Sequence, residues 1–281
     1  MFSIIHNPIG MIDFFDQMEH MAKRRNVIVN LSNVESMTPD AIAGLLAAIH
    51  RCKSTGAHVK GNVPRSAAPK KMLNESGFRN YVHSRVGARE HAEMGRIARF
   101  TRSSEAFNNR FDQFLATDLI QFANQRLRGQ ALPHQPSYSV FSEAMLNTWN
   151  HASRSEDSRE PWWASVYVDE DRHCACFTFL DRGVGIFGSH NLTLKLSLLS
   201  NLRVLNSAQL LKQIFKGEIP STTREAGRGN GIPGMYAHCR AGRIKNLTII
   251  SNHANGNAES ETYVVLPKEF VGTLLYWEIG L

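Results

Sequence analysis

The chain has 281 residues, of which 42% are hydrophobic and 20% charged. This content can fill one large core or two modest ones, and it excludes a largely disordered chain. The formal net charge of +7 is concentrated in one segment, because Lys60 to Arg102 contains ten basic and three acidic residues.

A basic segment of this kind can bind nucleic acid or an acidic partner. No groove-reading motif accompanies the Lys60–Arg102 stripe, so a solvated helix face and an interdomain linker are the favoured interpretation. Nucleic acid stays open as the less favoured partner.

The four cysteines are Cys52, Cys174, Cys176 and Cys239. They form no CxxC pair and no cluster with zinc-finger spacing, so we expect small buried residues in a reducing compartment. The opening residues lack the basic start of a signal peptide, and no apolar stretch approaches the roughly 20 residues that span a bilayer. A cytoplasmic protein without a membrane segment is expected.

The N-terminal part alternates strand-like and helix-like segments. Residues 27–31 suit a buried strand, and Thr38 is a suitable N-cap before a helix over Asp40–His50. Gly56 ends that helix, a second strand follows over residues 57–63, and Lys70–Ser76 predicts a short helix stopped by Gly77.

This order resembles a STAS domain of the anti-anti-sigma type, over roughly residues 4–85. The matching text runs from NVIVNLSNVESMTPD to LNESGF. In that family a serine at the helix start accepts phosphate, whereas the corresponding position here is Pro39, which has no hydroxyl. The resemblance therefore implies a STAS-like αβ domain over residues 1–90 without the usual phosphoacceptor, and Thr38 is the adjacent hydroxyl.

We expect a basic, irregular linker over residues 91–104. Aromatic and aliphatic residues then recur at helical spacing over 105–129, which predicts a helix with an apolar face. In the following segment, SVFSEAMLNTWNHA, the polar residues Glu143, Asn147, Asn150 and His151 share one face of a helix. A buried polar stripe needs partners: either Mg²⁺ with a triphosphate would supply them, or a satisfied network within the core.

Two glycine-rich segments follow. The apolar strand 175–180 leads into Asp181-Arg182-Gly183-Val184-Gly185, where a carboxylate at a strand end can accept a hydrogen bond from an adenine amine. Gly227-Arg228-Gly229-Asn230-Gly231 precedes a helix-like segment, and such backbone offers free N–H groups to phosphate. Neither a Walker loop nor a Rossmann fingerprint is present.

These motifs, in this order, resemble those of the GHKL ATPases over about residues 105–270. The resemblance implies a second domain over 105–281, a GHKL (Bergerat) ATP-binding α/β sandwich, so that the whole chain is an α/β protein. It implies ATP and Mg²⁺ as cofactors, a lid over 187–226, and Glu143 as the catalytic carboxylate. The implied binding residues are Asn147 at the metal, Asn150, His151, Asp181, Gly183, Gly185, Arg224, Gly227, Gly229, Asn230, Gly231 and the adenine-supporting Thr262.

Three functions fit this resemblance. The favoured one is a Mg²⁺-dependent ATPase that acts as a conformational switch on a protein partner, with a homodimer as one assembly. The others are an anti-sigma-type Ser/Thr protein kinase fused to its STAS-like regulator, and a module that senses ATP without hydrolysing it. An autophosphorylating histidine kinase is disfavoured, because no phosphoacceptor histidine motif precedes the ATP-binding segment.

Overall fold

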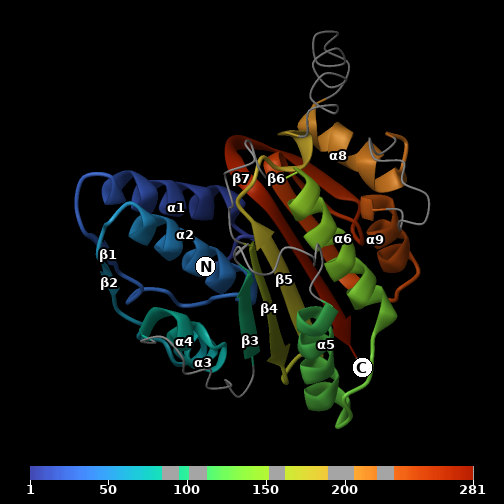
Figure 1. The fold of residues 1–281 in the computed structure, drawn as a ribbon, viewed down its shortest axis with the longest axis horizontal. Helices are drawn as coiled ribbons and strands as arrows, with labels where there is room; N and C mark the ends of the chain where they lie inside the picture. The colour runs from blue at the N-terminus through green and yellow to red at the C-terminus, as the bar shows by residue number, and fades with distance from the viewer. Residues whose placement is uncertain (84–94, 101–112, 152–161, 189–205, 220–230, 281) are drawn as a thin grey trace.

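The computed structural model describes residues 1–83, 95–100, 113–151, 162–188, 206–219 and 231–280. These residues form a mixed α/β structure with a five-stranded and a two-stranded sheet (Figure 1). The mixed α/β class expected from the sequence is confirmed.

The large sheet is antiparallel, with the strand order β3-β4-β5-β7-β6. Its strands are β3 (Gly95–Phe100), β4 (Trp162–Asp169), β5 (Cys174–Asp181), β6 (Lys245–Asn257) and β7 (Thr262–Gly280). Every residue of β5 is buried, and so are all but the last residue of β4. Burial of successive residues means that both faces of the sheet are covered.

One face is covered by α5 (Gln113–Arg128), α6 (Gln135–His151), α8 (Ser207–Lys216) and α9 (Gly231–Arg240). The centre of this layer is aromatic. The Phe177 and Trp277 rings stack with their centroids 5.2 Å apart, and Phe141 of α6 meets Trp277 edge-on at 4.8 Å. This contact fixes α6 against β5 and β7, the strands that carry the candidate site.

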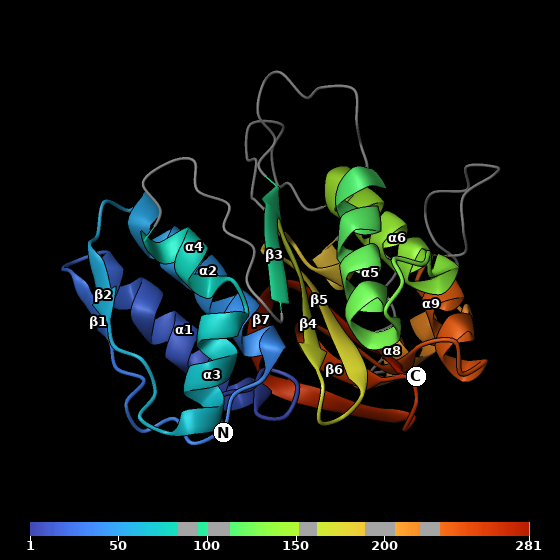
Figure 2. The ribbon, with the colours of Figure 1, turned by 90° about the horizontal axis from the view of Figure 1, so that it is seen from below.

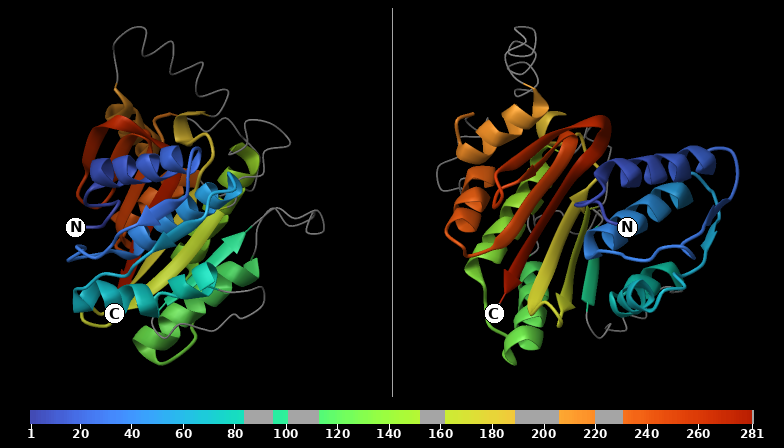
Figure 3. Two further views of the ribbon diagram at one scale, coloured as in Figure 1. Left: turned by 90° about the vertical axis from the view of Figure 1, so that its left-hand side faces the viewer. Right: turned by 180° about the vertical axis from the view of Figure 1, so that it is seen from behind.

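The opposite face is covered by α1 (Pro8–Ala22) and α2 (Pro39–Ser54), as Figures 2 and 3 show. Phe15 of α1 and Leu45 of α2 belong to the same buried cluster as Leu180 and Leu274 of the sheet. The N-terminal unit therefore does not close a core of its own. It shares one with the large sheet.

Within the N-terminal unit, β1 (Val27–Val29) and β2 (Val59–Gly61) pair in parallel on either side of α2 in sequence. α3 (Ala67–Glu75) and α4 (Phe78–His83) follow. The expected order of strand, helix, strand and short helix is confirmed, with Thr38 at the N-cap position of α2 although its side chain makes no capping hydrogen bond. α1 was not expected, although Asn7 caps it and Pro8 opens it.

Two expectations about connecting segments are wrong in part. Residues 95–100, expected in the linker 91–104, form the edge strand β3 of the large sheet. The expected lid 187–226 contains α8, whose Leu211 and Phe215 are buried in the main core. The apolar residues Leu210, Leu211, Ile214 and Phe215 at helical spacing were the signal that the sequence reasoning missed.

Candidate functional site

The carboxylate of Asp181 lies at the end of β5 and is buried. Its Oδ1 accepts a hydrogen bond from the backbone N–H of Gly183 at 2.8 Å, and its Oδ2 lies 3.3 Å from the hydroxyl of Thr148. Burial raises the pKa of Asp181 to about 6, against the lowering effect of these hydrogen bonds. A hydrogen bond from the Thr273 backbone also lowers this pKa, and a carboxylate has about four acceptor positions in all.

Thr148 is a site residue that the sequence reasoning missed. It lies on α6 directly after Asn147, and its hydroxyl is within hydrogen-bonding distance of both Ala144 O, at 3.0 Å, and Asp181. Its position among the polar residues of this motif could have suggested a role in the site. Only the packing of α6 on β5 reveals that this side of the helix contacts the strand end.

The glycine loop after Asp181 is held in place by β6. The backbone N–H groups of Ile186 and Phe187 donate to Ser251 Oγ and Asn252 Oδ1 at 2.9 and 3.1 Å, and Asn252 Nδ2 donates to Val184 O at 3.0 Å. Gly185 has a φ of +75°, and a Cβ on it would lie 2.3 Å from Asn252 Oδ1. Position 185 therefore requires glycine, for steric as well as conformational reasons.

The strand beside Asp181 is the later part of β7. Asp181 pairs with Thr273, and a Cβ on Gly272 would lie 2.1 Å from the Asp181 carbonyl oxygen. Thr262 was predicted to support the adenine site at Asp181. It pairs instead with Asn257, at the opposite end of β7, and is exposed. That placement of Thr262 is wrong, since Thr273 is the threonine next to Asp181.

The polar face of α6 meets the end of the second glycine segment. Glu143 is partly buried, and a Cβ on Gly231, at the start of α9, would lie 3.9 Å from Glu143 Oε2. Asn147, one turn after Glu143, is exposed. The structure thus brings together Glu143 and Gly231, which are distant in sequence, and places Asn147 where solvent reaches it.

Several predicted site residues cannot be located. Arg224, Gly227, Gly229 and Asn230 lie outside the described residues. The backbone of Asn150 and His151 belongs to the last turn of α6, but their side chains are not among those described.

The loop after β5 also contacts the N-terminal layer. Arg182, directly after Asp181, forms an ion pair with Glu19 of α1, with Nη2 and Oε1 2.5 Å apart. Glu19 Oε2 in turn lies 3.2 Å from Arg51 Nε of α2. The Arg182 side chain is only 8% exposed, so this contact is desolvated and is stronger than a surface pair.

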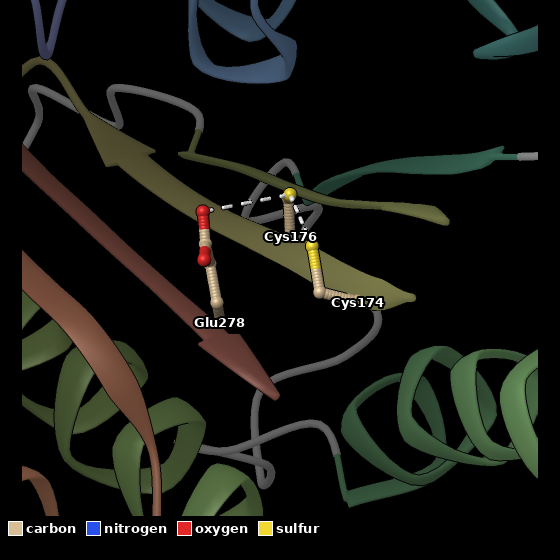
Figure 4. Close-up of side chains that lie close together, drawn as sticks. All are labelled: Cys174, Cys176 and Glu278. Atoms are coloured by element: carbon tan, nitrogen blue, oxygen red, sulfur yellow. Dashed lines mark hydrogen bonds between the residues drawn. The ribbon is translucent and has the colours of Figure 1, made fainter. Parts of the chain in front are cut away.

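A second polar cluster lies at the other end of β5. Cys174, Cys176 and Glu278 are buried, and their ligand-type atoms all lie within 4.8 Å of one another (Figure 4). The hydrogen bond between the two thiols lowers the pKa of Cys174 and raises that of Cys176. Cys174 pairs with Gly280, whereas Asp181 pairs with Thr273, so the two polar sites occupy opposite ends of one strand.

No model of a known protein family matches the chain, and no curated protein is significantly similar to it. Among the described residues, no helix combines the length and the apolar character that crossing a membrane requires.

Proposed function

We propose that the chain is an ATP-binding protein of the GHKL type, in which a STAS-like N-terminal unit packs on the ATP-binding sandwich. The observation that carries this proposal is the environment of Asp181. Its carboxylate ends a central strand and is buried, which raises its pKa although Gly183 N–H and the Thr148 hydroxyl donate to it.

This environment suits the exocyclic amine of adenine. A buried carboxylate that lacks enough donors has a raised pKa, and a ligand amine would supply the missing donor. Gly183 and Gly185 keep side-chain bulk away from the loop beside the carboxylate. A flat base could therefore lie close to the backbone there.

The residues on α6 and α9 suit the phosphate end of the same ligand. ATP with Mg²⁺ would supply a phosphoanhydride bond and a cation that accepts few protein ligands. The exposed amide of Asn147 is free to approach such a cation from solvent, and we assign it that role. Glu143, beside the N-terminus of α9, would take the proton of the attacking nucleophile.

Among the three functions that fit a GHKL site, the structure favours the switch. A kinase acting on its own N-terminal unit would need an accessible acceptor, and Thr38 Oγ1 is buried beside Asp40. By contrast, the Glu19–Arg182 ion pair gives the N-terminal unit a direct contact with the loop that would hold adenine. We propose that nucleotide binding alters this contact and thereby a surface for a protein partner. The free cysteines fit the cytoplasm as the place of action.

The test uses the full chain with ATP labelled on the γ-phosphate, in the presence of Mg²⁺. Label released as free phosphate supports the ATPase switch, and stable label on the protein supports the kinase. Binding without release or transfer supports a sensing module. If no nucleotide binds and Asp181→Asn changes nothing, the proposed site is wrong.

A further inference from the structure

Two thiol sulfur atoms and one carboxylate oxygen lie close together at one end of the large sheet. Cys174 and Cys176 project from the same face of β5, with their sulfur atoms 3.9 Å apart. Glu278, on the neighbouring strand β7, is the cross-strand partner of Cys176 and places Oε1 3.9 Å from its sulfur. Figure 4 shows the carboxylate and both sulfur atoms converging.

These distances match the needs of a tetrahedral zinc ion. Zinc binds thiolate sulfur at about 2.3 Å and carboxylate oxygen at about 2.0–2.2 Å. Two sulfur ligands at the tetrahedral angle are then roughly 3.7–3.8 Å apart, and a sulfur and an oxygen ligand roughly 3.5 Å apart. The two sulfur atoms, 3.9 Å apart, are already within a few tenths of an ångström of that value. Glu278 would have to rotate towards both sulfur atoms, because the three ligand atoms are spread over as much as 4.8 Å.

The carboxylate is oriented by residues that would remain outside the metal shell. Glu278 Oε2 accepts hydrogen bonds from Arg172 Nη2 and from Asn246 Nδ2, each at 2.9 Å. Oε1 accepts from Arg172 at 2.8 Å and from the phenol of Tyr276. A cation at Oε1 would displace the Tyr276 phenol. The Arg172 guanidinium, whose Nη2 contacts both carboxylate oxygens and whose Nη1 lies 3.9 Å from Cys176 Sγ, would have to turn towards solvent. Oε2 would stay hydrogen-bonded to Asn246, as ligating carboxylates usually are.

The charge balance also permits a divalent cation. With both thiols protonated, the buried group is neutral, because Arg172 compensates Glu278. Binding of one divalent ion releases two thiol protons, so the total charge does not change. The site can therefore take the ion without adding uncompensated charge to a buried region, where such charge is costly.

We propose that Cys174, Cys176 and Glu278 form a site for Zn²⁺ or a similar thiophilic divalent ion, with water or the Tyr276 phenol as fourth ligand. The ion would link the β4–β5 turn to the C-terminal end of β7. Sequence spacing alone does not predict the site, because Glu278 lies 102 positions from Cys176. The site is independent of nucleotide binding.

The experiment titrates the metal-free full chain with Zn²⁺ against a chromophoric chelator, and with Co²⁺ as a spectroscopic probe. We expect one equivalent of tightly bound Zn²⁺, and a Co²⁺ spectrum with thiolate-to-metal charge transfer and tetrahedral d–d bands. Cys174→Ala and Cys176→Ala should each weaken binding at least about tenfold, the lower end of the loss seen even for outer-shell changes. Cys52→Ala and Cys239→Ala are the matched controls, since both cysteines are buried and free elsewhere.

Two results would overturn the site. One is tight Zn²⁺ binding that survives in the Cys174→Ala/Cys176→Ala double variant, which would place the ion on other ligands. The other is wild-type protein that binds no Zn²⁺, or whose Co²⁺ complex lacks the thiolate-to-metal charge-transfer band. If a variant does not fold, X-ray absorption of the zinc-loaded wild type decides, because the proposal requires two sulfur neighbours at about 2.3 Å.

Discussion

Glu19 and Arg182 connect two parts of the chain that are remote in sequence, since their side chains pair between α1 and the loop after β5. Arg182 stands between Asp181, the candidate adenine acceptor, and Gly183, whose N–H binds that carboxylate. Because Glu19 also contacts Arg51 of α2, both helices that cover this face of the sheet are tied to the same loop. A shift of the loop must therefore stretch or release a contact in the N-terminal layer.

The first prediction concerns this pair. Glu19→Gln leaves Arg182 with a neutral partner in a largely desolvated position, and we expect the free energy of unfolding to fall by about 1.5–3 kcal/mol. ATP affinity should fall as well, because the loop is held less firmly. Urea unfolding and calorimetric titration with ATP measure the two effects.

Asp13 provides the matched control, because it also lies on α1 and pairs with an exposed residue, Lys268. Asp13→Asn should leave stability and ATP affinity close to wild type, since exposed pairs contribute little. Equal stability and equal ATP affinity of the two variants would mean that the Glu19–Arg182 contact contributes no more than a surface ion pair. If Glu19→Gln lowers stability while ATP binding does not change, the contact is structural only.

The second prediction follows from the raised pKa of Asp181. The folded protein holds this proton up to a pKa of about 6, whereas the usual value is 3.8. The folded state then binds more protons than the unfolded state between these values, so the contribution of Asp181 to stability falls as the pH rises through this window. At neutral pH the lost stability is on the order of 3 kcal/mol.

Asp181→Asn removes the charge and keeps the shape. We expect the variant to be more stable than wild type near neutral pH without nucleotide, and similar to it at about pH 3 and below, where Asp181 is mostly protonated in both states. It should also lose most of the stabilisation that ATP gives wild type, which for a hundredfold excess over Kd is about 2.7 kcal/mol. Equal ATP-induced shifts in both proteins would refute the adenine assignment, whatever the pH result.

The third prediction tests the close approach of β7 to Asp181. Gly272 and Gly56 both have positive φ, at +100° and +83°, but only Gly272 has backbone atoms where a Cβ would lie. Gly56→Ala should lower the free energy of unfolding by roughly 1–2 kcal/mol, because alanine disfavours the left-handed backbone conformation. Gly272→Ala should cost clearly more and should weaken ATP binding, because the alanine displaces the Asp181 backbone. Similar thermal shifts for the two variants would contradict this geometry.

The sequence predicted the elements that carry strong local signals and missed the contacts between them. The strand ending at Asp181, the helix with Glu143 and Asn147, and the N-terminal helix after Thr38 are where their patterns placed them. Local periodicity determines such elements, because one face of each must be buried.

Contacts between distant segments could not be read in this way. Nothing local distinguishes Thr273 from Thr262 as the neighbour of Asp181, since strand register decides it. Likewise, Glu19 and Asn252 contact the glycine loop only because α1 and β6 pack beside it. β3 was assigned to a linker because its two arginines hid a six-residue edge strand.

The fourth prediction separates chemistry from binding on α6. Glu143→Gln should reduce ATP turnover by about 10²–10⁴-fold, the usual contribution of a positioned general base, and should leave ATP affinity nearly unchanged. Asn147→Ala should weaken binding in Mg²⁺ more than in a metal chelator, because its amide is assigned to the cation. Release of phosphate at the wild-type rate by Glu143→Gln would show that Glu143 is not the base.

The last prediction distinguishes a switch from a kinase. A ligand shifts an equilibrium only by its different affinity for two states, so a switch requires a change in shape or assembly when nucleotide binds. We expect a non-hydrolysable ATP analogue to slow tryptic cleavage after Lys195, Arg203 and Arg224, in the sequence flanking α8, and to shift the protein towards dimers. Cleavage after Lys212, within α8, should be slow with or without the analogue, because that helix already packs in the core. Stable phosphate label on Thr38, with cleavage and assembly unchanged by the analogue, would instead establish the kinase and reject the switch.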